Sequence, residues 1–133
     1  MAGKDFVGYQ KLLDDALRGV VRQALLHVVK GGVMGAHHFY LTFDTRFPGV
    51  QLSDDLRTSY PEEMTIVLQN QFSGLKVDDR SFEVTLSFNK MPEAIVVPFA
   101  ALRQFGDPSQ NFGFKFEAAA AKGGAVEIGR AHV

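Results

Sequence analysis

The segment from Tyr9 to Lys30 constrains the fold most, because it holds the only pattern in the chain long enough for a multi-turn helix. Apolar residues recur there as adjacent pairs every four residues, with mostly charged residues between the pairs. That spacing is typical of an amphipathic α-helix, and the pair Gly31-Gly32 is a common way to end one. The paired residues are Leu12, Leu13, Ala16, Leu17, Val20, Val21, Ala24, Leu25, Val28 and Val29.

Two apolar rows make a wider stripe than a surface helix needs to cover a sheet. Two explanations stay open from the residues. In the first, the helix is sunk deeply into its own domain. In the second, one row packs on the domain and the other row packs on a second copy of the chain, which makes a dimer. The residues that we expect in such a dimer interface are Leu13, Leu17, Val20, Val21, Ala24 and Val28.

After Gly35 the apolar pattern changes to a period of two residues, which is typical of β-strands with one buried face. In HHFYLTFDT, for example, Phe39, Leu41 and Phe43 share one face. Turn signals such as Ser73-Gly74 separate these stretches. We expect strands at 37–45, 64–72, 81–88, 93–99 and 111–117, a polar loop from Ser53 to Glu63, and a short helix from Pro98 or Phe99 to Phe105.

The order of these elements predicts an α+β protein, mainly β, in which a small antiparallel barrel or sandwich carries a long N-terminal helix on its outside. A length of 133 residues fits one domain. We expect an N-terminal extension at 1–8, a folded domain at 9–117 and a final segment at 118–133. That final segment is expected to be a linker, a tail or an end added during cloning.

The composition argues against several classes of protein. A net charge of -1 gives no basic field to attract nucleic acid or a membrane surface. The absence of cysteine excludes disulfides, thiolate metal sites and a cysteine nucleophile. No apolar run approaches the roughly 18 to 20 residues that span a bilayer, and the N-terminus lacks the apolar core of a signal peptide. We therefore expect a cytoplasmic protein.

The residue patterns do not support a catalytic or metal site, so we expect no enzyme, no metal and no cofactor. His37 and His38 are neighbours in an expected strand and point to opposite faces, so they cannot easily bind one ion. No phosphate-binding, dinucleotide-binding or nucleophile-elbow motif is present. Adjacent acidic residues occur where solvated charges are the default. These pairs are Asp14-Asp15, Asp54-Asp55, Glu62-Glu63 and Asp78-Asp79.

The stretch YPEEMTIVLQNQF, residues 60–72, starts as a charged turn, becomes apolar and ends in three amides before an aromatic residue. Amide side chains both donate and accept hydrogen bonds and cost less to desolvate than charged groups. They therefore suit contacts with the backbone of a bound peptide. The same residues also suit an exposed strand end, in which Gln69 and Gln71 face solvent and Asn70 ends the strand. The residues alone leave both interpretations open.

Four stretches in a fixed order resemble the SspB family, specifically its shorter, alpha-type members. They are DALRGVVRQAL, HHFYLTFDT with the following PGV, YPEEMTIVLQNQF, and VVPFAALRQFGDPSQNFGFKF, and the resemblance covers Tyr9 to Glu117. SspB proteins are adaptors that deliver ssrA-tagged proteins to the ATP-dependent protease ClpXP. The resemblance implies an Sm-like fold, a homodimer that pairs the N-terminal helices, and a hydrophobic cleft for an extended peptide tag.

The resemblance also implies which parts of this chain form the cleft, namely the strands TIVLQNQF and FEVTLSF and the segment VPFAAL. We expect ssrA-tagged proteins, a second copy of the chain and ClpX as partners. SspB proteins dock on ClpX through a long acidic tail, which we expect to be missing here because the last residues, FEAAAAKGGAVEIGRAHV, depart from that pattern. The peptide-binding candidates are Phe43, Ile66, Leu68, Gln69, Asn70, Gln71, Phe72, Phe82, Val84, Val97, Phe99 and Ala100.

Two other functions remain as alternatives. A small Sm-like RNA-binding module would suit a phenylalanine-rich β-domain, because aromatic side chains stack on bases, but it would need a basic stripe. An enzyme that uses one of the acidic pairs would need a placed nucleophile or base. We expect neither nucleic acid nor a membrane as a partner.

Overall fold

The computed structural model describes residues 5–31, 35–69 and 72–116 of the chain. The long helix forms where its sequence predicts it, as α1, Tyr9–Gly31. Before its first turn, the carboxylate of Asp5 accepts hydrogen bonds from the backbone N–H groups of Gly8 and Tyr9, at 2.8 Å each. These bonds hold the pKa of Asp5 below its usual value. They help to satisfy the N–H groups that have no partner at the start of a helix.

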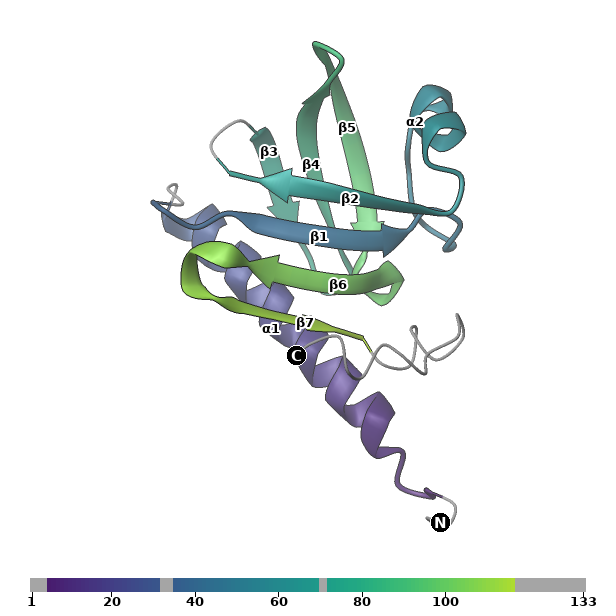
Figure 1. The fold of residues 1–133 in the computed structure, drawn as a ribbon, viewed down its shortest axis with the longest axis vertical. Coiled ribbons are helices and arrows are strands. Elements are labelled where there is room, and N and C mark those ends of the chain that lie inside the picture. Colours follow the sequence, from purple (N-terminus) through teal and green to yellow (C-terminus); the bar gives the residue numbers. More distant parts are fainter. Residues whose placement is uncertain (1–4, 32–34, 70–71, 117–133) are drawn as a thin grey trace.

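Within the described residues, the strands form two antiparallel sheets that pack face to face (Figure 1). Sheet A has the strand order β2-β1-β6-β7, and sheet B has the order β3-β4-β5. The predicted α+β class is confirmed, as a sandwich-like arrangement and not a closed barrel. The strands are β1 (Phe39–Asp44), β2 (Glu63–Leu68), β3 (Phe72–Val77), β4 (Ser81–Phe88), β5 (Met91–Pro98), β6 (Leu102–Asp107) and β7 (Phe112–Lys115).

The core lies between the sheets and follows from the alternation of side chains in each strand. Met64, Ile66 and Leu68 of β2 are buried and alternate with exposed residues, and β4 shows the same alternation. From α1, Val21 and Leu25 are fully buried in this core. Each such side chain stabilises the fold by about 1.5–3 kcal/mol relative to exposure in water.

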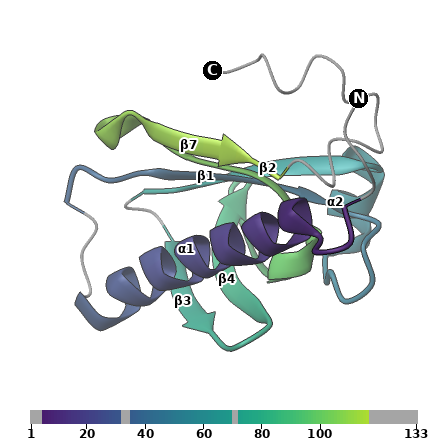
Figure 2. The same ribbon diagram turned by 90° about the horizontal axis from the view of Figure 1, so that it is seen from below.

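Two arginines of α1 tie the helix to both sheets. Arg18 Nε donates a hydrogen bond to the carbonyl of Phe99 at 3.2 Å, and its guanidinium lies 5.1 Å from the ring centroid of Phe116. Arg22 Nε donates to the carbonyl of Asp78 at 2.9 Å. Phe116 follows β7 in sheet A, whereas Asp78 follows β3 in sheet B. These contacts therefore fix the rotation of α1 about its own axis where the helix packs across β3 (Figure 2).

The polar stretch 53–63, which we expected to be a loop, contains the short helix α2, Asp54–Ser59. The hydroxyl of Ser53 caps it by accepting a hydrogen bond from the N–H of Leu56 at 3.2 Å. Leu56 itself is buried. A serine cap followed by two acidic residues is a helix start signal, but six residues are too few to show a helical period.

Two other expectations about the strands are wrong. The strand expected at 64–72 ends at Leu68, and Phe72 begins β3 in the other sheet. The turn expected at Ser73-Gly74 is a register shift inside β3, where Gly74 has a φ of +63°. Glycine reaches positive φ without strain in turns and in bulges, so its presence did not distinguish the two.

The helix expected to run to Phe105 is also wrong beyond its first turn. Only the 3-10 turn η1, Phe99–Ala101, is present, and β6 begins at Leu102. Leu102 and Phe105 are both buried, a spacing that a helix and an irregular strand share. β6 is irregular because its pairing with β1 shifts register between Thr42 and Phe43. This short stretch therefore has no clear apolar period from which a helix or a strand could be predicted.

Arg57 of α2 holds the loop that follows β1. Its Nη1 donates a hydrogen bond to the carbonyl of Thr45 at 3.0 Å, and its Nη2 donates to the carbonyl of Val50 at 2.5 Å. The next residue, Gln51, exchanges backbone hydrogen bonds with Val96 on the outer edge of β5. Arg57 thus supports a segment that covers one edge of sheet B.

Replacing Arg57 by glutamine removes charge-assisted hydrogen bonds to two backbone carbonyls. We expect the free energy of unfolding to fall by about 1–2 kcal/mol, measured by urea denaturation. Arg46→Gln is the control, since the nearest carboxylate oxygen, on Asp44, lies 3.6 Å from an exposed Arg46 side chain. If Arg57→Gln costs no more than this control, other contacts hold the loop.

Candidate functional site

Most of the apolar peptide-binding candidates lie in the core. Their side chains are at most 5% exposed and pack among the other core residues. An apolar alternation in a sequence identifies a face of a strand, but it does not say whether that face meets the other sheet or a ligand. The buried candidates are Phe43, Ile66, Leu68, Phe82, Val84, Val97 and Phe99.

The remaining candidates fall at two separate places. Gln69 is exposed just after β2, and Phe72 is half-buried at the start of β3, three residues further along the chain. Ala100 is exposed in η1, which follows the end of β5 farthest from the β4–β5 turn. Phe72, by contrast, pairs with Leu86 near that turn. The structure therefore keeps Gln69 and Phe72 together and separates them from Ala100. The candidates Asn70 and Gln71 lie outside the described residues.

The inner face of sheet B becomes progressively more exposed toward the β4–β5 turn. Val84 is fully buried, Leu86 is nearly so, Phe88 is half-buried, and Met91 is 63% exposed. Figure 1 shows why, because β2 crosses in front of β4 and β5 and their hairpin extends beyond it. We call this surface the uncovered end of sheet B. It consists of Phe72, Leu86, Phe88, Met91 and Glu93, which the pairing of the three strands brings together on one face.

Sequence reasoning missed four of these five residues, Leu86, Phe88, Met91 and Glu93. The alternation of β4 placed Leu86 and Phe88 on the correct face, but it gave no sign that sheet A stops short of them. The strands of sheet A run across β4 and β5, and β2 is the edge strand of that sheet, so no strand of sheet A lies over the part of the hairpin beyond β2 (Figure 1).

β2 borders this surface as an edge strand of sheet A. Among the described residues, no strand pairs with its outer side. An edge strand has unpaired backbone N–H and C=O groups, which an extended peptide can bind. An apolar floor beside a free strand edge supplies the two kinds of contact that an extended peptide needs.

The exposed side of α1 offers a second apolar surface. Its two apolar rows separate, since Val21 and Val28 pack on the domain, whereas Leu13 and Val20 are exposed. Leu17 and Ala24, the other expected dimer residues, are half-buried between the rows. The exposed row also includes Tyr9 and Ala16.

A groove of about 610 Å³ runs along the C-terminal half of α1, where the helix faces the ends of β1, β6 and β7. Phe39, Phe105 and Phe112 form most of its apolar wall opposite the helix. The helix contributes Val20, Ala24, His27 and Val28. The groove is continuous with the exposed row of α1, so the two form one apolar surface.

A buried carboxylate holds one rim of this groove. Asp107 is 4% exposed and accepts hydrogen bonds from Ser109 Oγ and from His37 Nδ1, each at 2.6 Å. Burial raises the pKa of Asp107, but the hydrogen bonds from Ser109, His37 and His38 outweigh it and hold the pKa below its usual value. The serine and the histidine share one acceptor, so they do not form the nucleophile–base chain of a hydrolase.

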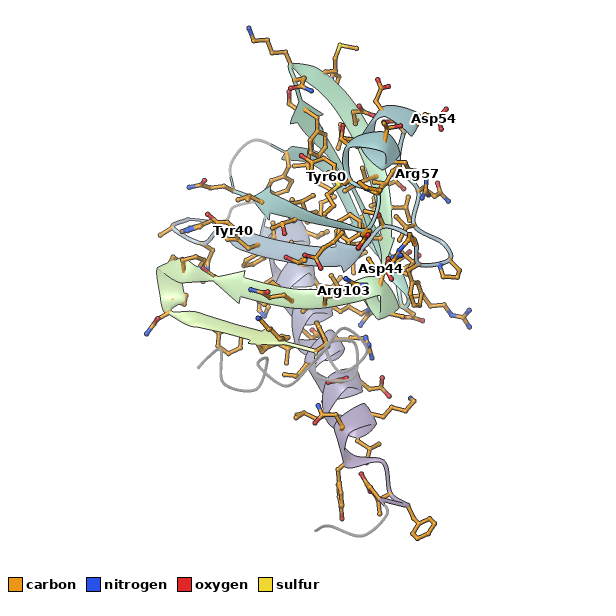
Figure 3. All side chains as sticks on the ribbon, turned by 45° about the vertical axis from the view of Figure 1, so that its right-hand side comes forward. Tyr40, Asp44, Asp54, Arg57, Tyr60 and Arg103 are labelled. Atoms are coloured by element: carbon orange, nitrogen blue, oxygen red, sulfur yellow. The ribbon has the colours of Figure 1, made fainter. Side chains whose placement is uncertain are left out.

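Several acidic residues, including members of the acidic pairs in the sequence, form ion pairs or hydrogen bonds that stabilise the fold. Arg103 lies on β6, and Figure 3 shows it close to Asp44 of the neighbouring β1. Its guanidinium lies 3.2 Å from Asp44 and 3.0 Å from Glu63 of β2. Asp78 accepts hydrogen bonds from the N–H groups of Arg80 and Ser81, at 2.8 Å each, which hold the pKa of Asp78 below its usual value. Carboxylates used in this way are not poised for acid–base catalysis.

The outer face of sheet A carries a shallow trough of about 510 Å³. The directly paired glycines Gly106 and Gly113 are part of its lining, with Tyr40 on β1 beside them. Thr42 and Thr65 Oγ atoms are 2.7 Å apart and hydrogen-bond to each other. The trough offers hydroxyl and amide groups, without an activated nucleophile among its described residues.

Across residues 5–31, 35–69 and 72–116, no group of three histidine or carboxylate side chains is arranged to hold a metal ion. No helix in the same ranges is long and apolar enough to cross a membrane.

A comparison with protein families gives one match. The family model for SspB, stringent starvation protein B, matches residues 11–131. The match extends past Glu117 and so includes most of the final segment 118–133. No curated protein matched the sequence. Because the match covers nearly the whole chain, this protein belongs to the SspB family, whose members are adaptors in proteolysis rather than enzymes.

Proposed function

We propose that this protein is a non-enzymatic adaptor that binds the ssrA tag of substrate proteins and delivers them to the ClpXP protease. Membership of the SspB family carries the proposal. The uncovered end of sheet B supports it, since an apolar floor beside a free strand edge suits an extended peptide. ATP hydrolysis by the protease, and not chemistry on this chain, supplies the energy.

The proposed tag site consists of the uncovered end of sheet B together with the amides that follow β2. The tag lies extended along the edge of β2, so that alternate side chains point at Phe72 and Phe88. Gln69, with Asn70 and Gln71, supplies hydrogen bonds to the tag backbone. The buried candidates, such as Ile66 and Val84, act from beneath by fixing the positions of the two strands.

The proposed assembly is a cytoplasmic homodimer that pairs the exposed row of α1 and its groove with those of a second copy. Apolar surface of this kind is costly to leave in water. A dimer holds two tag sites together, and tethering to the protease raises the local concentration of substrate without any new contact.

Calorimetric titration with an ssrA peptide tests the function directly. We expect one peptide bound per chain, with little dependence on salt. No binding at tens of micromolar would overturn the proposal. Binding of an oligonucleotide in place of the peptide, with affinity that falls steeply with salt, would favour the RNA-binding alternative.

Phe88→Ala tests the location of the tag site. Phe88 is half-buried at the uncovered end of sheet B, where it packs against the border of the core and leaves part of its ring available to a ligand. We expect the tag to bind about tenfold or more weakly, because the contact of an aromatic side chain is lost. Tyr40→Ala is the control, since Tyr40 is an aromatic residue that is 41% exposed on the outer face of sheet A, outside both proposed surfaces. Equal tag affinity in the two variants would place the site elsewhere.

Val20→Asp tests the dimer surface. Val20 is 40% exposed on the row that includes Leu13, and a buried, unpaired charge there opposes association. We expect the dissociation constant of the dimer to rise at least about tenfold, measured by sedimentation. Val29→Asp is the control, because Val29 is 43% exposed and lies about two and a half turns further along α1, on its opposite side. A monomeric unmodified protein, or equal effects of the two changes, would contradict the proposed interface.

A further inference from the structure

Glu93 is a charged residue on an apolar face. It lies in β5 directly opposite Leu86 of β4, and its neighbours on the same face of β5 are Met91 and Ile95. Ile95 is fully buried and Met91 is mostly exposed, so Glu93 stands where the core gives way to the uncovered end of sheet B. Its own side chain is half-buried.

The carboxylate of Glu93 has no hydrogen bond or ion pair with any described residue. Most described carboxylates do have such partners, including the buried Asp107 and the half-buried Asp44. The others without one are exposed, except Glu83, which points to the outer face of sheet B. Glu93 is therefore the one described carboxylate that is half-buried, unpaired and directed to the inner face.

A partly desolvated charge beside apolar side chains costs free energy unless a ligand pairs with it. A partner that brings an N–H donor recovers this cost, and a partner that brings a second carboxylate increases it. The position of Glu93 at the border of the proposed tag site makes the bound peptide the group that comes within reach. No described side chain competes for it.

We propose that Glu93 determines specificity within the tag site, by requiring an N–H donor on the tag residue that lies over it and by rejecting an acidic residue there. A lysine or arginine side chain binds the carboxylate most strongly because it is positively charged, and a neutral amide binds it less strongly. The inference rests on the proposed function, because it takes an extended peptide as the occupant of the uncovered end of sheet B.

The test is a titration of wild-type protein with single substitutions in the ssrA peptide, in which each position is changed in turn to lysine, asparagine and aspartate. We expect one position at which lysine binds best and aspartate worst, with a difference of roughly three- to tenfold. Glu93→Lys reverses this order at the same position. The lysine preference also weakens between low and high salt, because partly exposed charges are screened.

Two further variants keep the outcome clear. Glu93→Gln removes the charge with little change in shape, and we expect it to lose most of the discrimination between lysine and aspartate. Glu83→Gln, which removes a half-buried carboxylate from the opposite face of the adjacent strand, leaves the discrimination unchanged. Circular dichroism checks that each variant is folded.

Failure of this inference and failure of the proposed function give different results. If the parent peptide binds wild-type protein but no position shows a preference that Glu93→Gln removes, the role of Glu93 is wrong and the tag site stands. If the parent peptide does not bind at all, the proposed function fails and the specificity with it.

Discussion

The eight-residue pairing between β4 and β5 sets the limits of both the core and the candidate site. The inner face of this hairpin is one continuous row of cross-strand pairs, from Phe82 with Val97 to Phe88 with Met91. The strands of sheet A cross this hairpin and the sheet ends at its edge strand β2, so it covers only the first part of that row (Figure 1). The same alternation therefore makes a closed core at one end and a half-exposed surface at the other. No special residue is needed for the change, only the end of sheet A at β2.

The orientation of α1 depends on a second constraint, which is polar. Arg18 and Arg22 hydrogen-bond backbone carbonyls that follow β5 and β3, and this fixes which row of the helix meets the domain. Val21 and Leu25 then fall in the core, and the row that contains Val20 faces outward. The apolar pattern alone could not select between the rows, since both consist of the same kinds of residue. The helix is therefore not sunk into its own domain on both rows, and its exposed row is the surface proposed to pair with a second copy.

The sequence predicted the helix and the faces of the strands well, because each depends on a local period. It predicted the end of β2 poorly, because the chain changes sheets after Leu68 in a stretch with no proline or glycine to mark it. It also could not separate core from ligand surface. Val84 and Phe88 occupy equivalent places in one alternation, and only the extent of the opposite sheet makes one of them buried and the other half-exposed. That extent is a property of the tertiary fold, and no local pattern contains it.

The two apolar surfaces lie on opposite sides of the molecule, with the β4–β5 hairpin on one side and α1 on the other (Figure 1). They share no residue, so a change in one surface reaches the other only through the core between them. For an adaptor this separation has a physical advantage. Occupation of the proposed tag site by an extended peptide leaves the proposed dimer surface free, so the two associations need not compete. Coupling between them would require a rearrangement of the fully buried residues, such as Val84 and Val21, that fill the sandwich. Close-packed cores resist small rearrangements, so the packing favours independent binding at the two proposed surfaces.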